Sequence, residues 1–192
     1  MYQKRNKELE IIKLYTTNYK KEFYLRQISK LAELALKTCQ NTLAGLEKEN
    51  ILKSRTDGKN KYFRLNLSNI QTKSRLLQAE IYKLDSFIKK YPQINMFLKS
   101  LNTNTPLIVF GSFAKLKADK NSDLDLLVLS SEKQDLPFHC LPYKVHEINL
   151  FEESFKKALS ENEAFIQEIQ DNHVILNNPS FYINITWEHY GK

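Results

Sequence analysis

Residues 107–129 read LIVFGSFAKLKADKNSDLDLLVL, and this stretch decides the fold that we expect for the second half of the chain. It starts with an apolar run, residues 107–110, that ends at Gly111-Ser112, which is the pattern of a buried strand followed by a tight turn. The run from Asp123 to Leu129 predicts a second strand, in which Asp123 and Asp125 alternate with apolar residues. Alternation places both carboxylates on one face of the strand. Two like charges on an apolar face are costly unless a bound cation compensates them.

The segment from Gly111 to Asp125 resembles the nucleotidyltransferase motif, which is Gly-Ser, ten further residues and Asp-x-Asp. Ten residues separate Ser112 from Asp123. The motif belongs to the DNA polymerase beta-like superfamily, and within it the likeness is to the small minimal nucleotidyltransferases. Three flanking residues also agree with that branch: Phe110, Ala114 and Ser122. The resemblance implies a mixed sheet flanked by helices, and transfer of a nucleoside monophosphate from a nucleoside triphosphate.

The resemblance also implies roles for individual residues. Asp123 and Asp125 are expected to bind Mg²⁺ or Mn²⁺ together with the nucleoside triphosphate, which is expected to be ATP. Gly111 lets the backbone approach the phosphates, and Ser112 offers a hydroxyl and an amide at a helix N-terminus. Lysines of the following segment can reach phosphate or lie in a solvated loop: Lys115, Lys117 and Lys120.

The family usually has a third acid on the next strand, which we predict over residues 143–150. Glu147 is the only acid in that segment, so we assign it as the third catalytic residue and metal ligand. His146 points to the opposite face and is interpreted as structural, whereas Asp135, in an expected loop, is the second choice. Leu116 stands where the family commonly has a second Gly, and Glu147 stands where it commonly has Asp. These departures leave open a retained fold with weak or lost activity.

Charge separates the first part of the chain from the last. Residues 1–70 carry 15 Lys and Arg against 7 Asp and Glu, whereas residues 106–192 carry 8 against 13. A basic segment joined to an acidic one predicts two domains with different partners, and nucleic acid is the commonest partner of a basic surface. The alternative is a solvated, Lys-rich surface.

Apolar spacing predicts three helices in the basic part, over residues 6–18, 23–34 and 38–50. Two strands are expected after them, over residues 51–55 and 61–67, joined by a hairpin turn at Asp57-Gly58. This order resembles a winged helix-turn-helix domain over about residues 6–68, and the resemblance implies DNA binding.

In such a domain the third helix enters the major groove and the wing lies against phosphates. The expected base-reading residues are Lys37, Thr38, Gln40 and Asn41. The expected phosphate contacts on the wing are Arg55, Lys59 and Lys61. The alternative is a domain that makes protein contacts only.

Residues 69–91 predict one long helix, which Pro92 ends. Its apolar residues follow the spacing of a coiled-coil seam: Leu77, Ile81, Leu84, Ile88 and Tyr91. This seam indicates either packing between the domains or a homodimer. The expected organisation is a winged-helix domain over residues 1–68, connecting helices over 69–104 and a nucleotidyltransferase domain over 105–192.

The sequence as a whole therefore predicts an α+β, two-domain, cytoplasmic protein. No apolar run approaches the ~20 residues needed to cross a bilayer, and Cys39 and Cys140 form no metal or redox spacing. The expected function is DNA binding combined with Mg²⁺-dependent nucleotidyl transfer to an unknown acceptor. The resemblance implies a partner toxin with a HEPN domain as one such acceptor. The rival is a non-catalytic transcriptional regulator that senses nucleotide or dimerises, while an antibiotic-modifying enzyme fits less well because it needs no basic module.

Overall fold

The computed structural model describes residues 5–191, which form two compact units. One unit contains the described chain up to Ala79 together with Tyr190 and Gly191, and the other contains Glu80–His189. The division falls inside α4 (Ile70–Lys90), which occupies the place of the expected connecting helix. None of the helices in the described residues is long and apolar enough to cross a membrane.

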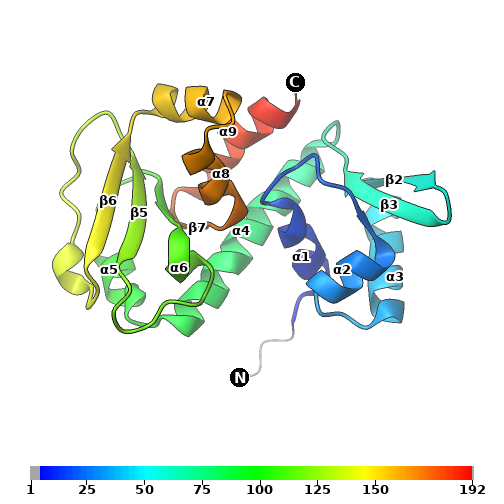
Figure 1. Ribbon diagram of the computed structural model, residues 1–192, viewed down its shortest axis with the longest axis horizontal. Coiled ribbons are helices and arrows are strands. Elements are labelled where there is room, and N and C mark those ends of the chain that lie inside the picture. The colour runs from blue at the N-terminus through cyan, green and yellow to red at the C-terminus, as the bar shows by residue number, and fades with distance from the viewer. Residues whose placement is uncertain (1–4, 192) are drawn as a thin grey trace. The chain divides into compact units, whose positions relative to one another are not determined.

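The first unit contains three α-helices, a short 3-10 helix and a small sheet, followed by the start of α4 (Figure 1). Its elements in chain order are α1 (Lys7–Ile12), η1 (Lys13–Tyr15), β1 (Phe23–Tyr24), α2 (Leu25–Leu31), α3 (Leu36–Lys48), β2 (Leu52–Asp57) and β3 (Asn60–Leu65). Strand β1 is a correction, because apolar spacing predicts that the second helix begins at Phe23. Phe23 and Tyr24 instead pair with Phe63 and Tyr62, so the sheet order is β1-β3-β2.

Positive backbone φ angles end the elements of this unit where the sequence predicts turns. Asp57 pairs with Asn60 across the hairpin, and Gly58 in the turn between them has φ +57°, as the Asp-Gly signal predicts. Helix α3 ends before Asn50, which has φ +58°, and the Ile51 amide donates to the Leu46 carbonyl. This is the Schellman pattern, which satisfies the last carbonyls of a helix.

The second unit is built on a mixed four-stranded sheet with the order β6-β5-β4-β7. Strands β5 and β6 are parallel, and the other two pairs are antiparallel. After α4 its elements are α5 (Ile94–Ser100), β4 (Leu107–Val109), α6 (Gly111–Ala114), β5 (Leu124–Leu129), η2 (Phe138–Cys140), β6 (Val145–Leu150), α7 (Glu152–Ser160), α8 (Ala164–Asp171), β7 (Val174–Asn177) and α9 (Pro179–Gly191). The expected α+β chain with a mixed sheet flanked by helices is thus confirmed.

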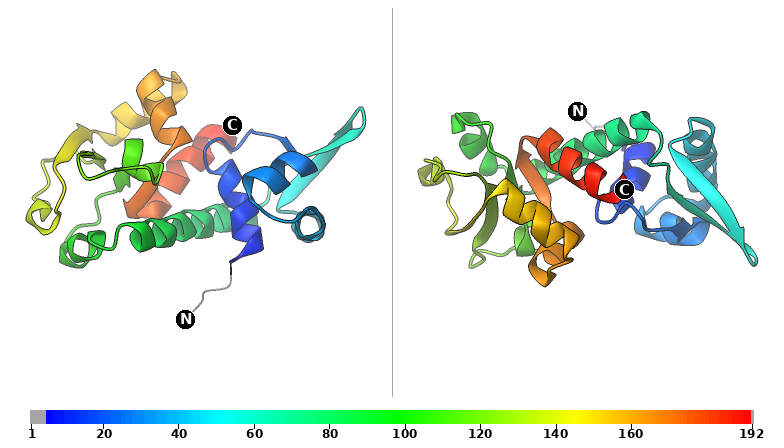
Figure 2. Two further views of the ribbon diagram at one scale, coloured as in Figure 1. Left: turned by 60° about the horizontal axis from the view of Figure 1, so that its bottom comes forward. Right: turned by 90° about the horizontal axis from the view of Figure 1, so that it is seen from above.

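Helices cover both faces of this sheet, as can be followed in Figure 2. Alternation along β5 sends Leu124, Leu126 and Val128 to a core shared with α4, α5 and α6. Leu127 and Leu129 point the other way, into a core shared with α7, α8 and α9. A strand buried on both faces presents its polar groups at its ends, and Asp125 lies at the start of β5.

The helices of this unit depart from the sequence pattern in two places. The apolar residues Phe155, Leu159, Phe165, Ile166 and Ile169 have the spacing that predicts one helix. The structure instead divides this segment into α7 and α8, which are separated at Asn162 with φ +53°. The expected coiled-coil seam on α4 is not one continuous exposed face. Leu84 and Tyr91 pack into the core of their own unit, while Ile81 remains exposed. The homodimer therefore stays a prediction.

A buried ionic cluster links α4 to the segment before β7. The Glu80 carboxylate lies 2.9 Å from His173 Nε2 and 2.8 Å from Lys83 Nζ, and the Glu80 and His173 side chains are fully buried. Burial alone would raise the pKa of Glu80, but His173 and Lys83 lower it to about 2. Glu80 is therefore held in its ionised form inside the folded unit.

Candidate functional site

The turn between β4 and α6 brings the backbone of Gly111 against the side chain of Asp125. Gly111 has φ +67°, and a Cβ atom built on it would lie 2.3 Å from Asp125 Oδ2. The Phe110 amide donates to the Asp125 carbonyl at 3.1 Å, which ties the turn to the start of β5. Only glycine satisfies both the backbone angle and the closeness of the carboxylate.

The short helix α6 ends in a conformation that also favours glycine. Leu116 has φ +57°, its amide donates to Phe113, and the Lys117 amide donates to the Ser112 carbonyl at 3.0 Å. This is another Schellman ending, with Leu116 at the position that is usually Gly. Leu116, which stands where the resemblance predicts a second glycine, therefore keeps the left-handed backbone that a glycine would adopt. This conformation costs an L-residue about 1–2 kcal/mol.

Local hydrogen bonds hold the loop that leads to Asp123. The Asp119 carboxylate accepts from the Asn121 amide at 2.9 Å and from the Ser122 hydroxyl at 3.1 Å, and these bonds lower the pKa of Asp119. The Tyr91 hydroxyl accepts from the Ala118 amide at 3.2 Å. Neither Asp119 nor Tyr91 was predicted from the sequence as part of the site. The Asp-x-x-Ser spacing of a local turn was the available signal for Asp119.

A side chain of β6 and the side chain that directly precedes β6 contact the paired acids. The register of the parallel strands pairs Asp125 with His146, and His146 Nδ1 lies 3.2 Å from Asp125 Oδ1. Because an ionised carboxylate can only accept, the imidazole is the donor of this hydrogen bond. Lys144 Nζ lies 3.3 Å from Asp123 Oδ2. The strand that was expected to supply a third acid therefore presents a lysine and a histidine at the two aspartates.

Glu147 does not join this group. It pairs with Leu126, whose side chain faces the opposite core from Asp125, and its carboxylate accepts from Asn149 Nδ2 at 2.8 Å. His146 does lie on the face opposite Glu147, as expected, and the same register shows that this is the face that carries Asp125. Asp135, the second choice for a third acid, lies exposed outside the helices and strands. Both faces of β6 carry apolar residues, so alternation alone could not show which face holds the site.

The donor set fits a metal that arrives with the phosphates of a nucleotide. Among residues 5–191, no group of three or more His, Cys, Asp and Glu side chains could hold a metal ion by itself. Mg²⁺, however, is usually bound through one or two carboxylates together with substrate phosphates and water. Asp123 and Asp125 are partly exposed and can supply those carboxylates. The predicted phosphate-contacting lysines of the neighbouring loop are all exposed: Lys115, Lys117 and Lys120.

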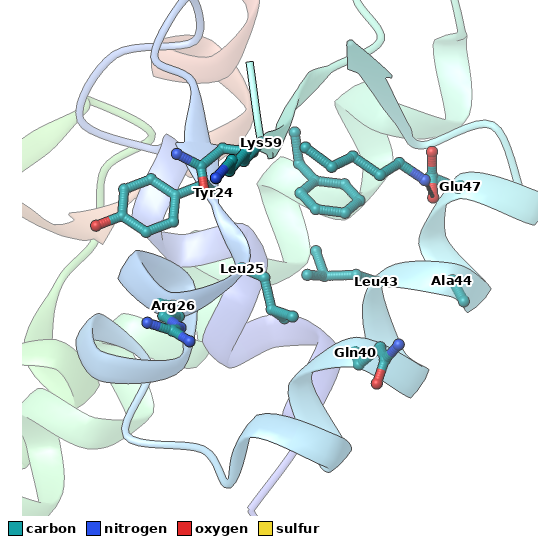
Figure 3. Close-up of a pocket in the computed structure, with 11 residues that line it drawn as sticks. Tyr24, Leu25, Arg26, Gln40, Leu43, Ala44, Glu47 and Lys59 are labelled. Carbon is teal, nitrogen blue, oxygen red and sulfur yellow. Dashed lines mark hydrogen bonds and ion pairs between the residues drawn. The ribbon is translucent and has the colours of Figure 1, made fainter. Parts of the chain in front are cut away.

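The first unit contains a groove of about 860 Å³ between α2, α3 and the β2–β3 hairpin (Figure 3). Its polar lining includes Arg26, Gln40 and Lys59. The other predicted base-reading residues lie on α3, where Lys37 and Asn41 are exposed and Thr38 is half-buried. This groove thus brings together predicted DNA-contacting residues from α3 and from the β2–β3 hairpin.

Two of the three predicted wing cations are already paired with acids of the same unit. Arg55 bonds to Glu22 at 2.7 Å and to Asp57 at 3.0 Å. Lys61 bonds to Glu47 at 2.7 Å. Burial would raise the pKa of Glu47, but hydrogen bonds from Lys61 and Ser54 lower it. The pairs Arg55–Glu22 and Lys61–Glu47 join segments distant in sequence, so the sequence pattern could not reveal them.

Comparison with known proteins agrees with the geometry of the second unit. The chain matches the family model described as nucleotidyltransferase domain over residues 91–188, which is 98 of its 192 residues. No curated protein and no solved structure matches it. The matched segment contains the Gly111–Ser112 turn, both aspartates and strand β6. The chain therefore belongs to the nucleotidyltransferase domain family.

Proposed function

We propose that the unit Glu80–His189 transfers a nucleoside monophosphate from a nucleoside triphosphate, with ATP as the expected donor, to an acceptor molecule. The observation that carries the proposal is the closeness of Gly111 to Asp125. A glycine at positive φ ends one strand and lies against a carboxylate that begins the next, so a phosphate chain can approach backbone and carboxylate together. Membership of the nucleotidyltransferase family supports the reaction type.

In the proposed reaction an acceptor oxygen forms a bond to the α-phosphorus, and the bond from that phosphorus to the bridging oxygen breaks. Pyrophosphate leaves with the electron pair, and the acceptor proton passes to solvent. Mg²⁺ or Mn²⁺, when bound, offsets the charge that develops on the phosphates. Asp123 and Asp125 hold the metal–nucleotide complex, and Ser112 orients a phosphate oxygen. The exposed lysines of the α6–β5 loop attract the triphosphate.

The test is transfer of label from α-phosphate-labelled ATP in the presence of Mg²⁺, with the full chain alone and with lysate of its source. Asp123→Asn removes one proposed ligand. Asp85→Asn is a matched control, because Asp85 and Asp123 are both 43% exposed and each pairs with a lysine. We expect label on an acceptor with the unmodified chain and the control, and at least a hundredfold less with Asp123→Asn. Equal labelling by Asp123→Asn would overturn the proposal.

The identity of the labelled product decides the acceptor. The resemblance to minimal nucleotidyltransferases implies a protein acceptor, such as a toxin with a HEPN domain. Label in the protein fraction that resists nuclease would support a protein acceptor. Label that nuclease removes would assign a nucleic-acid acceptor instead.

A second candidate function is nucleotide sensing without transfer. It is favoured by the orientation of Glu147, which faces away from the two aspartates. The family usually has a third acid on this strand beside the other two, and a site without it would bind nucleotide but not transfer it. Under this alternative, ATP binds in a metal-dependent way that Asp123→Asn abolishes, while no label reaches any acceptor. Measuring ATP binding beside the transfer assay separates the two candidates.

We further propose that the first unit is a winged-helix DNA-binding domain, and that both units act in one cytoplasmic protein. Its support is the exposed polar face of α3, with Lys37, Gln40 and Asn41, beside a groove that Arg26 and Lys59 also line. Affinity for duplex DNA should fall steeply as salt rises, because phosphate contacts release counterions. Binding that is unchanged between ~50 and ~200 mM salt would contradict phosphate contacts.

A further inference from the structure

We propose that His146 is a positioning residue, which holds the Asp125 carboxylate in the orientation that receives the metal–nucleotide complex. This inference rests on the proposed function of the second unit. It starts from the register of β5 and β6, which pairs Asp125 with His146 in a parallel ladder. Register-paired residues of neighbouring strands leave the sheet on the same face, so the imidazole stands beside the carboxylate.

Asp125 has two hydrogen-bond partners and lies against the backbone of Gly111. Its carbonyl accepts from the Phe110 amide at 3.1 Å. Its Oδ1 accepts from His146 Nδ1 at 3.2 Å, and its Oδ2 lies so close to Gly111 that a Cβ atom there would come within 2.3 Å. The carboxylate is therefore fixed in rotation as well as in place, and His146 is the side chain that fixes the rotation.

Asp123 is held less firmly. It precedes β5, and its partner Lys144 has a side chain that is 82% exposed. An ion pair at such an exposed lysine contributes about 0–1 kcal/mol and restrains little. Asp125 is therefore the more firmly oriented of the two aspartates, and the orientation of its carboxylate depends on His146 of β6.

A histidine suits this position better than a lysine would. An imidazole with its proton on Nδ1 donates one directed hydrogen bond to Oδ1 and needs no net charge to do so. It orients the carboxylate without cancelling the negative charge that attracts a cation. Partners of this kind behind metal-binding groups typically account for 10–100-fold in metal affinity. Because the His146 side chain is 63% exposed, we expect the lower end of that range.

The experiment measures the binding of Mn²⁺·α,β-methylene-ATP, which cannot transfer its nucleotide, to the full chain by electron paramagnetic resonance. His146→Ala removes the hydrogen bond, and His146→Asn keeps a donor at the same distance along the side chain. Glu147→Gln is the matched control, because it lies on the same strand and faces the opposite way. Circular dichroism and thermal unfolding show that each variant is folded.

We expect the dissociation constant to rise about tenfold in His146→Ala, and to stay within about threefold of the unmodified chain in His146→Asn and Glu147→Gln. Unchanged or tighter binding by His146→Ala would overturn the proposal, because the histidine would then be inert or a competitor for the carboxylate. Equal losses in His146→Ala and His146→Asn would overturn it in favour of a direct contact with metal or nucleotide. Absence of binding by the unmodified chain would overturn the proposed function together with this inference.

Discussion

Replacing Gly111 by Ala tests the contact on which the candidate site depends. The backbone at Gly111 has φ +67°, a conformation that costs an L-residue about 1–2 kcal/mol. The added Cβ would also lie 2.3 Å from Asp125 Oδ2, whereas ordinary contacts begin near 3.4 Å. The carboxylate must therefore move by about 1 Å, and pushing it off its rotamer costs about 0.5–1.5 kcal/mol more.

The two effects should appear in different measurements. The free energy of unfolding of the second unit should fall by about 1.5–3.5 kcal/mol, which is the sum of the backbone and rotamer costs. Nucleotidyl transfer should fall about a hundredfold, because a misplacement of about 1 Å in an active site has that effect. Urea unfolding and the label-transfer assay measure these two quantities.

Gly58→Ala is the matched control. Gly58 also has positive φ, +57°, but nothing lies within 4 Å of the position that an added Cβ would occupy. The change should lower the stability of the first unit by about 1–2 kcal/mol, through the backbone alone, and leave transfer unchanged. The close approach of Gly111 to Asp125 is refuted as a determinant of stability and transfer if Gly111→Ala loses no more stability than Gly58→Ala and keeps transfer within about threefold of the unmodified chain.

Three further predictions concern strain, pH and DNA. Leu116→Gly should raise the free energy of unfolding by about 0.5–1 kcal/mol in urea, because relief of the left-handed backbone exceeds the entropy that glycine loses on folding. Lowering the pH from about 4.5 to about 2 should remove roughly 3 kcal/mol from the second unit, because the folded state favours ionised Glu80 against its protonated form. Glu80→Gln should flatten that acid dependence in pH-resolved unfolding, and a dependence that persists would assign it elsewhere. Glu47→Gln should free Lys61 and steepen the salt slope of DNA binding by about one, as fluorescence anisotropy would show, whereas an unchanged slope would mean that Lys61 meets no phosphate.

The turn and the paired aspartates could be located from the sequence because their determinants are local. A four-residue apolar run, a Gly-Ser turn and an alternating Asp-Leu-Asp segment lie within about twenty residues of one another, and the family model matches the same region. The Asp57-Gly58 hairpin could be predicted for the same reason. In each case the preferred backbone angles of a few residues specify the structure.

The partners of those local motifs could not be predicted in the same way. His146 and Glu147 are neighbours on a strand with apolar residues on both faces, so their alternation is symmetric and only the register with β5 decides which one meets Asp125. Strand β1 has two residues and takes its identity from pairing with β3. The bond between Lys61 and Glu47 joins residues fourteen positions apart, from a hairpin and a helix.

The sequence by itself therefore determined the domain family, the position of the Gly111 turn and the alternation of Asp123 and Asp125 with apolar residues. Local backbone preference and alternation suffice for these features. Tertiary structure alone decided that His146 rather than Glu147 stands beside Asp125, and that Glu80 is ionised in the core. Both depend on strand register and on burial among distant segments, which are set by the packing of the whole unit rather than by any short stretch of the chain.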